Sequence, residues 1–198
     1  MKKMNMVCIA FYGVLIMVTL STKVSANWRL ADSGSEVYFI STKNQHISEI
    51  HQFSQLNGSL TDAGVLRIEI NLASVETGID IRNTRMREKL FLVDRFPNAT
   101  LDAVLPEELM KLEVGHSVNV ELPVKLTIMT TEKLLNIAVQ VSKTMDGKLI
   151  ATSSKPTLIG AADFGLKSGV ELLQQLAGLS SIGLSVPVTF NLTFEPVD

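Results

Sequence analysis

The sequence predicts an all-β protein, an eight-stranded antiparallel barrel with two short helices. Two observations predict it: apolar and polar residues alternate over most of the chain, and turn-forming residues separate the alternating runs. Eight strands can close into a barrel that is filled by side chains or holds one slender ligand. Two stacked sheets satisfy the same alternation, so the pattern alone leaves closure open. The predicted strands lie near residues 35–42, 48–61, 64–72, 98–105, 116–129, 133–143, 147–161 and 181–195.

The chain begins with a candidate secretory signal peptide, residues 1–26. Lys2 and Lys3 give a basic start, an apolar run follows, and small residues end the segment at Ala26. The run is shorter than the roughly 20 apolar residues of a membrane-spanning helix, which favours cleavage after Ala26 over a retained anchor. Cleavage leaves 198 − 26 = 172 residues as one barrel domain, 27–198, and removes Cys8, the only cysteine. We therefore expect a periplasmic or secreted protein without disulfides and without a stable membrane span.

The strands of the mature chain carry one apolar face each. Residues 66–72, 118–128 and 135–142 alternate apolar with mostly polar side chains. The last strand shows the pattern over six apolar positions: Leu184, Val186, Val188, Phe190, Leu192 and Phe194. Full burial of six such side chains contributes on the order of 9 to 18 kcal/mol, which is an upper bound. Between strands, Asp62-Ala63-Gly64 predicts a hairpin, and Asp146-Gly147 predicts a two-residue type I′ hairpin loop.

Residues 74–97 are the only long interruption of the strand pattern, and we expect a short helix there. Thr77 and Asp80 have the spacing of a capping box, which predicts a helix start at Thr77. Helical periodicity gathers apolar side chains on one face and basic ones on its flank. We interpret the segment as a lid or plug with a cationic edge, and a connecting helix with a solvated charged face is the simpler alternative. The apolar face comprises Ile79, Met86, Leu90 and Val93, and the basic flank comprises Arg82, Arg85 and Lys89.

A second helix is expected late in the chain. Ser168 and Glu171 have capping-box spacing, and leucines follow at helical intervals. Gly178 suits the position just after a helix, where a left-handed backbone conformation is common.

Several motifs resemble those of one family. They are residues 73–78 (ASVETG), 81–83 (IRN), 85–87 (RMR), 90–91 (LF), 96–100 (FPNAT), 163–165 (DFG) and 186–188 (VPV). Nearly end to end from Trp28, the mature chain is similar to the YceI-like family of bacterial envelope proteins. The resemblance implies a lipocalin-like barrel that binds polyisoprenoid lipids. The chain departs from the family at Met129-Thr130, where many members have His-Gly, and at Gly160-Ala161-Ala162, where many have Asn-Arg-Ser, so contacts of those family residues do not carry over.

The lipid hypothesis implies an elongated cavity with apolar walls and polar or basic groups at its mouth. Arg82, Arg85 and Arg87 are the candidates for a phosphate head group, because a guanidinium fork matches phosphate oxygens. Arg87 falls on another side of the helix, so at most a subset can converge on one group. Ordinary core packing is the alternative for each apolar wall. The candidate walls are Phe39, Phe53, Ile68, Ile70, Phe91, Phe96, Leu122, Leu126, Ile137, Val139, Phe164 and Phe190.

The residues argue against several other functions. His46, His51 and His116 lack the spacing of metal ligands, and we expect no metal site and no cofactor. The sequence contains no Gly-x-Ser-x-Gly motif, which would predict a serine nucleophile. The Asp163-Phe164-Gly165 triplet occurs in kinases, but the other kinase motifs do not accompany it here. We therefore assign no catalytic residue. The net charge of −2 at pH 7 gives no indication of nucleic-acid binding.

Three functions remain. The first is a lipid carrier or sequestering protein whose guest is an isoprenoid lipid or a quinone. The second is a structural or partner-binding envelope barrel with a filled interior and no ligand. A homodimer is a further possible partnership. The third is an enzyme acting on an enclosed substrate, which needs an inward-pointing acid such as Glu49, Glu76 or Asp163. We expect a binding protein and not an enzyme.

Overall fold

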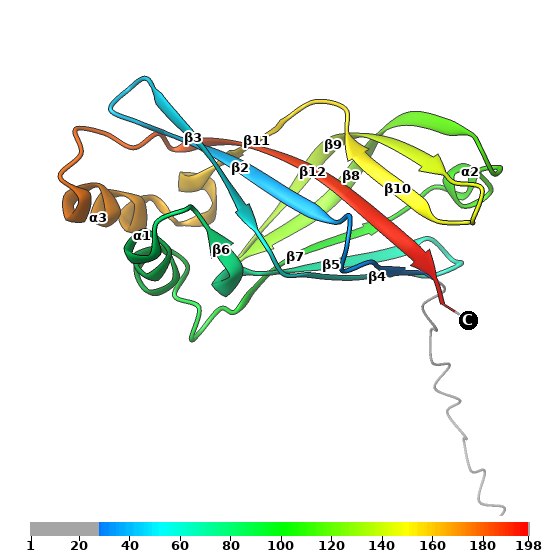
Figure 1. Cartoon of the computed structure of the whole chain (residues 1–198), viewed down its shortest axis with the longest axis horizontal. Coiled ribbons are helices and arrows are strands. Elements are labelled where there is room, and N and C mark those ends of the chain that lie inside the picture. The colour runs from blue at the N-terminus through cyan, green and yellow to red at the C-terminus, as the bar shows by residue number, and fades with distance from the viewer. Residues whose placement is uncertain (1–27, 198) are drawn as a thin grey trace, which may run out of the picture.

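The computed structural model describes residues 28–197, which form a closed antiparallel β-barrel with short helices at its ends (Figure 1). The order of the pairings is β1-β4-β5-β7-β8-β9-β10-β12-β2-β3-β6, and a further pairing of β1 with β12 closes the ring. The strands are β1 (Trp28–Leu30), β2 (Glu36–Lys43), β3 (Ile47–Phe53), β4 (Leu56–Leu60), β5 (Val65–Asn71), β6 (Val75–Glu76), β7 (Asn98–Val104), β8 (Ser117–Ile128), β9 (Thr131–Lys143), β10 (Leu149–Ser153), β11 (Thr157–Gly160) and β12 (Ser185–Pro196).

Several of these strands are consecutive parts of one longer strand. β10 and β11 pair with one edge of β12, and β1 and β2 pair with its other edge. β3 and β4 are separated only by residues 54–55. Taken together, β1/β2, β3/β4, β5, β7, β8, β9, β10/β11 and β12 form a ring of eight antiparallel strands. This confirms the predicted eight-stranded barrel and excludes two separate stacked sheets, although β1 and β6 have no counterpart among the predicted strands.

The alternation of the sequence becomes the two faces of the barrel wall. In β8, Leu122, Val124 and Leu126 are buried while the intervening positions are exposed. In β9, Ile137, Val139 and Val141 are buried, with half-buried Ala138 and exposed Gln140 between them. Leu122 is paired with Ile137 across the two strands, so their side chains share the inner face. The period of two therefore predicts correctly which residues point inward.

Two helical segments cover one end of the barrel. α1 (Asp80–Arg85) continues directly into η2 (Met86–Phe91), which is a π-helical turn, and α3 (Lys167–Ala177) lies against η2. Figure 1 shows α1 and α3 together at one end, with α2 (Glu107–Met110) and the C-terminus at the other. Buried Met86, Leu90 and Phe91 pack with residues of the barrel wall in one core cluster, which fixes this helical end to the strands. Short 3₁₀ turns are η1 (Leu72–Ser74) and η3 (Ala161–Phe164).

Both predicted helices are present, but their starts differ from the predicted caps. α1 begins at Asp80 after an uncapped Ile79, and not at Thr77, because the Thr77 hydroxyl donates to Asn83 Oδ1 at 2.6 Å. α3 begins at Lys167 with no side-chain cap from Ser168, since the preceding Leu166 already has a helical backbone. Gly178 ends α3 in the left-handed conformation, as predicted.

Both predicted hairpin turns are found at the predicted positions, but one of them is of a different type. Asp62-Ala63-Gly64 joins β4 to β5. The loop between β9 and β10 is longer than a two-residue type I′ turn: the Thr144 amide donates to the Lys148 carbonyl, and only Gly147 has a positive φ within it. A type I turn followed by a left-handed glycine has this pattern and matches the strand twist as well as a type I′ turn does.

Candidate functional site

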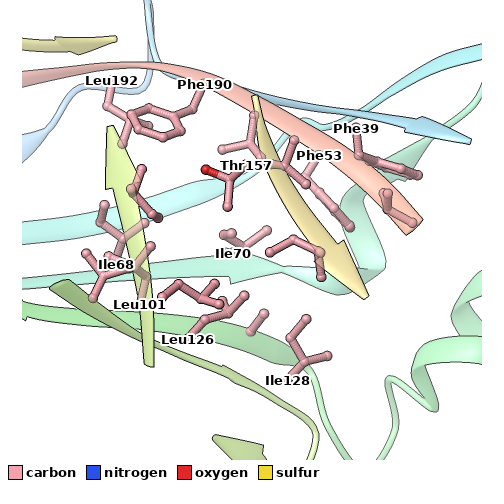
Figure 2. Close-up of a pocket in the computed structure, with 18 of the residues that line it drawn as sticks. Phe39, Phe53, Ile68, Ile70, Leu101, Leu126, Ile128, Thr157, Phe190 and Leu192 are labelled. Carbon is pink, nitrogen blue, oxygen red and sulfur yellow. The ribbon is translucent and has the colours of Figure 1, made fainter. Parts of the chain in front are cut away.

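The barrel encloses an apolar cavity of about 250 Å³. All strands of the ring except β1 contribute side chains to it, and η2 and α3 close it at the helical end. Figure 2 shows inward-pointing carbon side chains from several strands, among them Phe39, Ile68 and Leu126, with a single oxygen on Thr157. Among the described residues that line the cavity, Thr157 alone has a polar side chain. The interior therefore contains an apolar space that does not favour water. The alternative of a barrel filled by its own side chains does not fit this structure.

The size of the cavity defines what can occupy it. A cavity of about 150 Å³ holds one benzene molecule, so this one has room for roughly ten carbons. Walls that face an empty space lack contacts, and so free energy, that a packed interior has. An apolar guest that fills the space recovers part of that free energy. The site is thus suited to a hydrocarbon chain and not to a polar metabolite.

Ten of the predicted wall residues line the cavity: Phe39, Phe53, Ile68, Ile70, Phe91, Leu122, Leu126, Ile137, Val139 and Phe190. The other two lie elsewhere. Phe164 is the last residue of η3 and is buried in the core cluster that includes Leu90 and Phe91, but it does not line the cavity. Phe96 follows the helical segment on the outside, where the Arg95 guanidinium lies 5.3 Å from its ring centroid. Their aromatic type suggested a wall, but both lie outside the strand pattern that determines which residues face inward.

On the helical side of the cavity, Phe91 of η2 is the one lining residue that was predicted as a wall. Met86 and Leu90 of η2, with Leu166 and Val170 around the start of α3, line this end. Met86 and Leu90 were expected on the apolar face of the first helix, and that face is the signal that identifies them. Ile79 was expected there too, but it is 46% exposed because it precedes the helix.

The three candidate head-group arginines do not line the cavity. Arg82 donates to Glu49 Oε2 at 2.9 Å and to Thr77 Oγ1 at 2.8 Å. Arg85 donates to the Leu176 carbonyl at 3.1 Å and so links α1 to α3. Arg87 donates to the Ala73 carbonyl and to Thr84 Oγ1 at 3.4 and 3.3 Å. The structure therefore separates them, and each has contacts within the chain.

Polar side chains gather where β2 and β3 run toward α1. His51 is 4% exposed, and its Nε2 lies 2.8 Å from Ser41 Oγ. Two residues before His51 in β3, Glu49 Oε2 accepts from Lys43 Nζ at 2.8 Å as well as from Arg82. Hydrogen bonding to Lys43, and then the charge of Arg82, lowers the pKa of Glu49. Burial, followed by the charge of Arg82, lowers the pKa of His51, so this imidazole is neutral at pH 7.

An enzyme that acts on an enclosed substrate would need an acid inside the cavity, but the three candidate acids lie elsewhere. Glu49 is held between Lys43 and Arg82, and Glu76 accepts from the Gly78 amide and Asn83 Nδ2. Asp163 lies exposed on η3, and none of the three lines the cavity. Within residues 28–197, no three His, Cys, Asp or Glu side chains gather closely enough to hold a metal ion. No helix in the same range combines the length and the apolar character that crossing a membrane requires.

The fold and the cavity define a class of protein, closed eight-stranded barrels with an enclosed apolar space. The YceI-like domain matches residues 28–194, and the chain therefore belongs to the YceI-like family. A polyisoprenoid binding domain from Saccharophagus degradans, implicated in plant cell wall breakdown, is 32% identical with a TM-score of 0.84, over 87% of this chain and 100% of that chain. BcnA from Burkholderia cenocepacia shares the fold at 18% identity and a TM-score of 0.63, over 83% of this chain and 98% of that chain. No curated protein matches the chain.

Proposed function

We propose that this chain is an exported binding protein that holds a polyisoprenoid, a quinone or a similar long-chain amphiphile inside its barrel, as a carrier or for sequestration. Carbons beyond the roughly ten that fit the cavity are accommodated by movement of wall side chains. The observation that carries the proposal is the cavity of about 250 Å³ inside the barrel, whose lining is apolar apart from Thr157. Such a space favours a hydrocarbon guest because burying each CH₂ group contributes about 0.8 kcal/mol.

Two further observations support the proposal. The Saccharophagus degradans domain, which shares 32% of its residues with this chain, is a polyisoprenoid binding domain. Residues 1–26, outside the part that the structure describes, have the pattern of a secretory signal with cleavage after Ala26. Export places the barrel in the periplasm or outside the cell, next to membranes that contain isoprenoid lipids.

Lipid extraction tests the guest. The full chain is expressed in a bacterium with its signal segment, purified from the envelope fraction without detergent, and analysed by native mass spectrometry and by extraction of bound lipid. We expect a bound long-chain isoprenoid in a one-to-one complex. Protein that is empty in every preparation, and that takes up no isoprenoid when one is added, would contradict the proposal.

A pair of alanine variants tests whether the guest lies inside the barrel. Ala151 of β10 lines the cavity, whereas Ala138 of β9 faces outward between buried Ile137 and Val139. Ala151→Phe fills part of the cavity and is expected to reduce lipid uptake at least tenfold, while Ala138→Phe leaves it unchanged. Equal uptake by both folded variants would place the lipid on the surface instead.

Export is tested separately by fractionation and N-terminal sequencing. The mature protein is expected in the periplasm or medium with Asn27 as its first residue. A cytoplasmic protein that retains Met1 would contradict export. It would not contradict lipid binding, which the extraction experiment tests separately.

A further inference from the structure

The inner face of β2 and β3 changes from apolar to polar along its length. Side chains two residues apart share a face of a strand, so Ser41 follows Phe39 inside β2 and His51 precedes Phe53 inside β3. Phe39 and Phe53 line the cavity, and Phe39 is directly paired with His51 across the two strands. Their rings lie close, with centroids 5.1 Å apart. His51 therefore lies inside the barrel, next to the apolar cavity at its helical end.

His51 has one nitrogen that is not satisfied. Its Nε2 meets Ser41 Oγ at 2.8 Å, but its buried Nδ1 has no hydrogen-bond partner among the described residues. A buried polar atom without a partner is unfavourable, and most such atoms in folded proteins are bonded. The side chain is 4% exposed, so bulk solvent does not offer an easy substitute. The imidazole is thus a buried polar group beside Phe39 at the helical end of the apolar space, although it is not itself one of the residues that line the cavity.

Charged groups lie beyond His51 on the way to the surface. Lys43 and Arg82 both bond Glu49 Oε2, at 2.8 and 2.9 Å, and the side chains of all three are 25–30% exposed. Along one face, the interior therefore passes from hydrocarbon to neutral polar groups and then to charges near solvent. An amphiphile with a long tail and a small head has the same order of polarity.

We propose that His51 Nδ1 binds the hydroxyl group of an isoprenoid alcohol whose hydrocarbon tail occupies the cavity. This inference rests on the proposed function and names the head group of its guest. A hydroxyl both donates and accepts, so it bonds Nδ1 in either imidazole tautomer, whereas a quinone carbonyl needs the Nδ1–H form. The bond satisfies the unpaired nitrogen and fixes which end of the guest faces the helices.

A phosphate head fits this position less well. A dianion beside a neutral, buried imidazole loses its hydration without gaining a full countercharge. Lys43 and Arg82 both form ion pairs with Glu49, whose negative charge neutralises one of the two positive charges. The geometry therefore favours an uncharged head at His51.

The test compares three probes of equal chain length: geraniol, the C10 hydrocarbon 2,6-dimethyl-2,6-octadiene, and geranyl phosphate. Their roughly ten carbons match the cavity without enlarging it. Affinities are measured by displacement of a fluorescent apolar probe from the mature protein. We expect geraniol to bind about tenfold more tightly than the hydrocarbon, and geranyl phosphate to bind no more tightly than geraniol. Tighter binding of the phosphate that is lost in Arg82→Gln would overturn the assignment.

Variants locate the preference for the hydroxyl. His51→Leu is expected to remove the tenfold preference while keeping hydrocarbon affinity, which also shows that the variant is folded. His51→Gln, which keeps a polar group, should restore part of it. His116→Leu is the matched control, since the His116 side chain is 66% exposed and outside the barrel. If the preference survives His51→Leu and disappears in Thr157→Val, the head group lies at Thr157, the polar residue of the cavity wall, and this proposal is wrong.

Nuclear magnetic resonance of ¹⁵N-labelled histidine gives a readout without any substitution. Addition of geraniol is expected to shift the His51 Nδ1 resonance of the wild-type protein, and addition of the hydrocarbon is not. Binding of geraniol with no shift at Nδ1 refutes the His51 contact but leaves the lipid proposal intact. Failure of all three probes and of longer isoprenoids to bind refutes the proposed function itself.

Discussion

At the scale of single residues, Asn83 determines how the chain enters its first helix. It is 4% exposed, its Oδ1 accepts from the Thr77 amide at 2.9 Å and from the Thr77 hydroxyl, and its Nδ2 donates to Glu76 at 3.1 Å. Asn83→Leu keeps the branching and the number of side-chain heavy atoms but leaves a buried amide without an acceptor. We expect a loss of about 2 kcal/mol in the free energy of unfolding, measured by chemical denaturation. Asn136→Leu, on the exposed face of β9, is the control and should change stability by less than about 0.5 kcal/mol.

A second residue-scale prediction concerns His51 and pH. Burial lowers the pKa of His51 below its ordinary value of about 6.5. As the pH falls below that value, the unfolded chain takes up a proton at His51 that the folded protein does not, so folding becomes less favourable. We expect His51→Gln to gain in stability relative to wild type between about pH 7.5 and pH 5.5, measured by urea denaturation. Glu49 does not interfere, because its lowered pKa keeps it ionised throughout this window. A constant difference between the two proteins would show that His51 protonates equally in both states.

At the scale of elements, the contact between η2 and α3 depends on Gly169. A Cβ atom there would lie 2.9 Å from Leu90 Cδ1 and 3.0 Å from the Lys89 carbonyl oxygen. Alanine normally favours a helix by about 1 kcal/mol over glycine, but overpacking costs about 1–3 kcal/mol and should dominate here. Gly169→Ala is therefore expected to lower the melting temperature. The neighbouring exposed Ser168→Ala should leave it unchanged or slightly raised, since Ser168 does not cap α3. If Ser168→Ala is the more damaging change, the capping-box interpretation was right after all.

The sequence predicts the strands better than the helix starts, for a physical reason. Strand periodicity arises because one whole face of the strand is buried. It can therefore be read from the sequence alone, as in Leu122 to Leu126 and Ile137 to Val141. A helix cap depends on one hydroxyl, which any nearby polar group can capture. Thr77 has the predicted spacing, yet its hydroxyl goes to Asn83, and Arg82 also bonds to it. The sequence does not contain the geometry that decides this competition.

At the scale of the whole molecule, alternation also predicted most of the cavity wall but not its polar end. Ile68, Ile137 and Phe190 were identified because a closed ring must direct one face of every strand inward. The arginines were proposed because a guanidinium group matches phosphate oxygens, but Arg82 instead bonds Glu49, which is 33 residues away in the sequence. His51 was considered only as a metal ligand. Its proximity to the cavity follows from its pairing with Phe39, which requires the register of β2 and β3.

The volume of the cavity predicts how affinity depends on chain length. Alcohols of one and two isoprene units fit into about 250 Å³, and each added CH₂ should tighten binding about fourfold, which corresponds to about 0.8 kcal/mol. A third or fourth unit must displace wall side chains such as Leu90 and Leu166, so the gain per unit should fall beyond about ten carbons. Phe190→Ala enlarges the cavity and is expected to shift this break to longer chains, whereas Ile50→Ala, on a 70% exposed outer position, is not. Dissociation constants of the C5, C10, C15 and C20 alcohols for the three proteins test this. An equal gain for every unit up to C20 would mean that the chains do not end inside the barrel, and that they extend along a path which this cavity does not define.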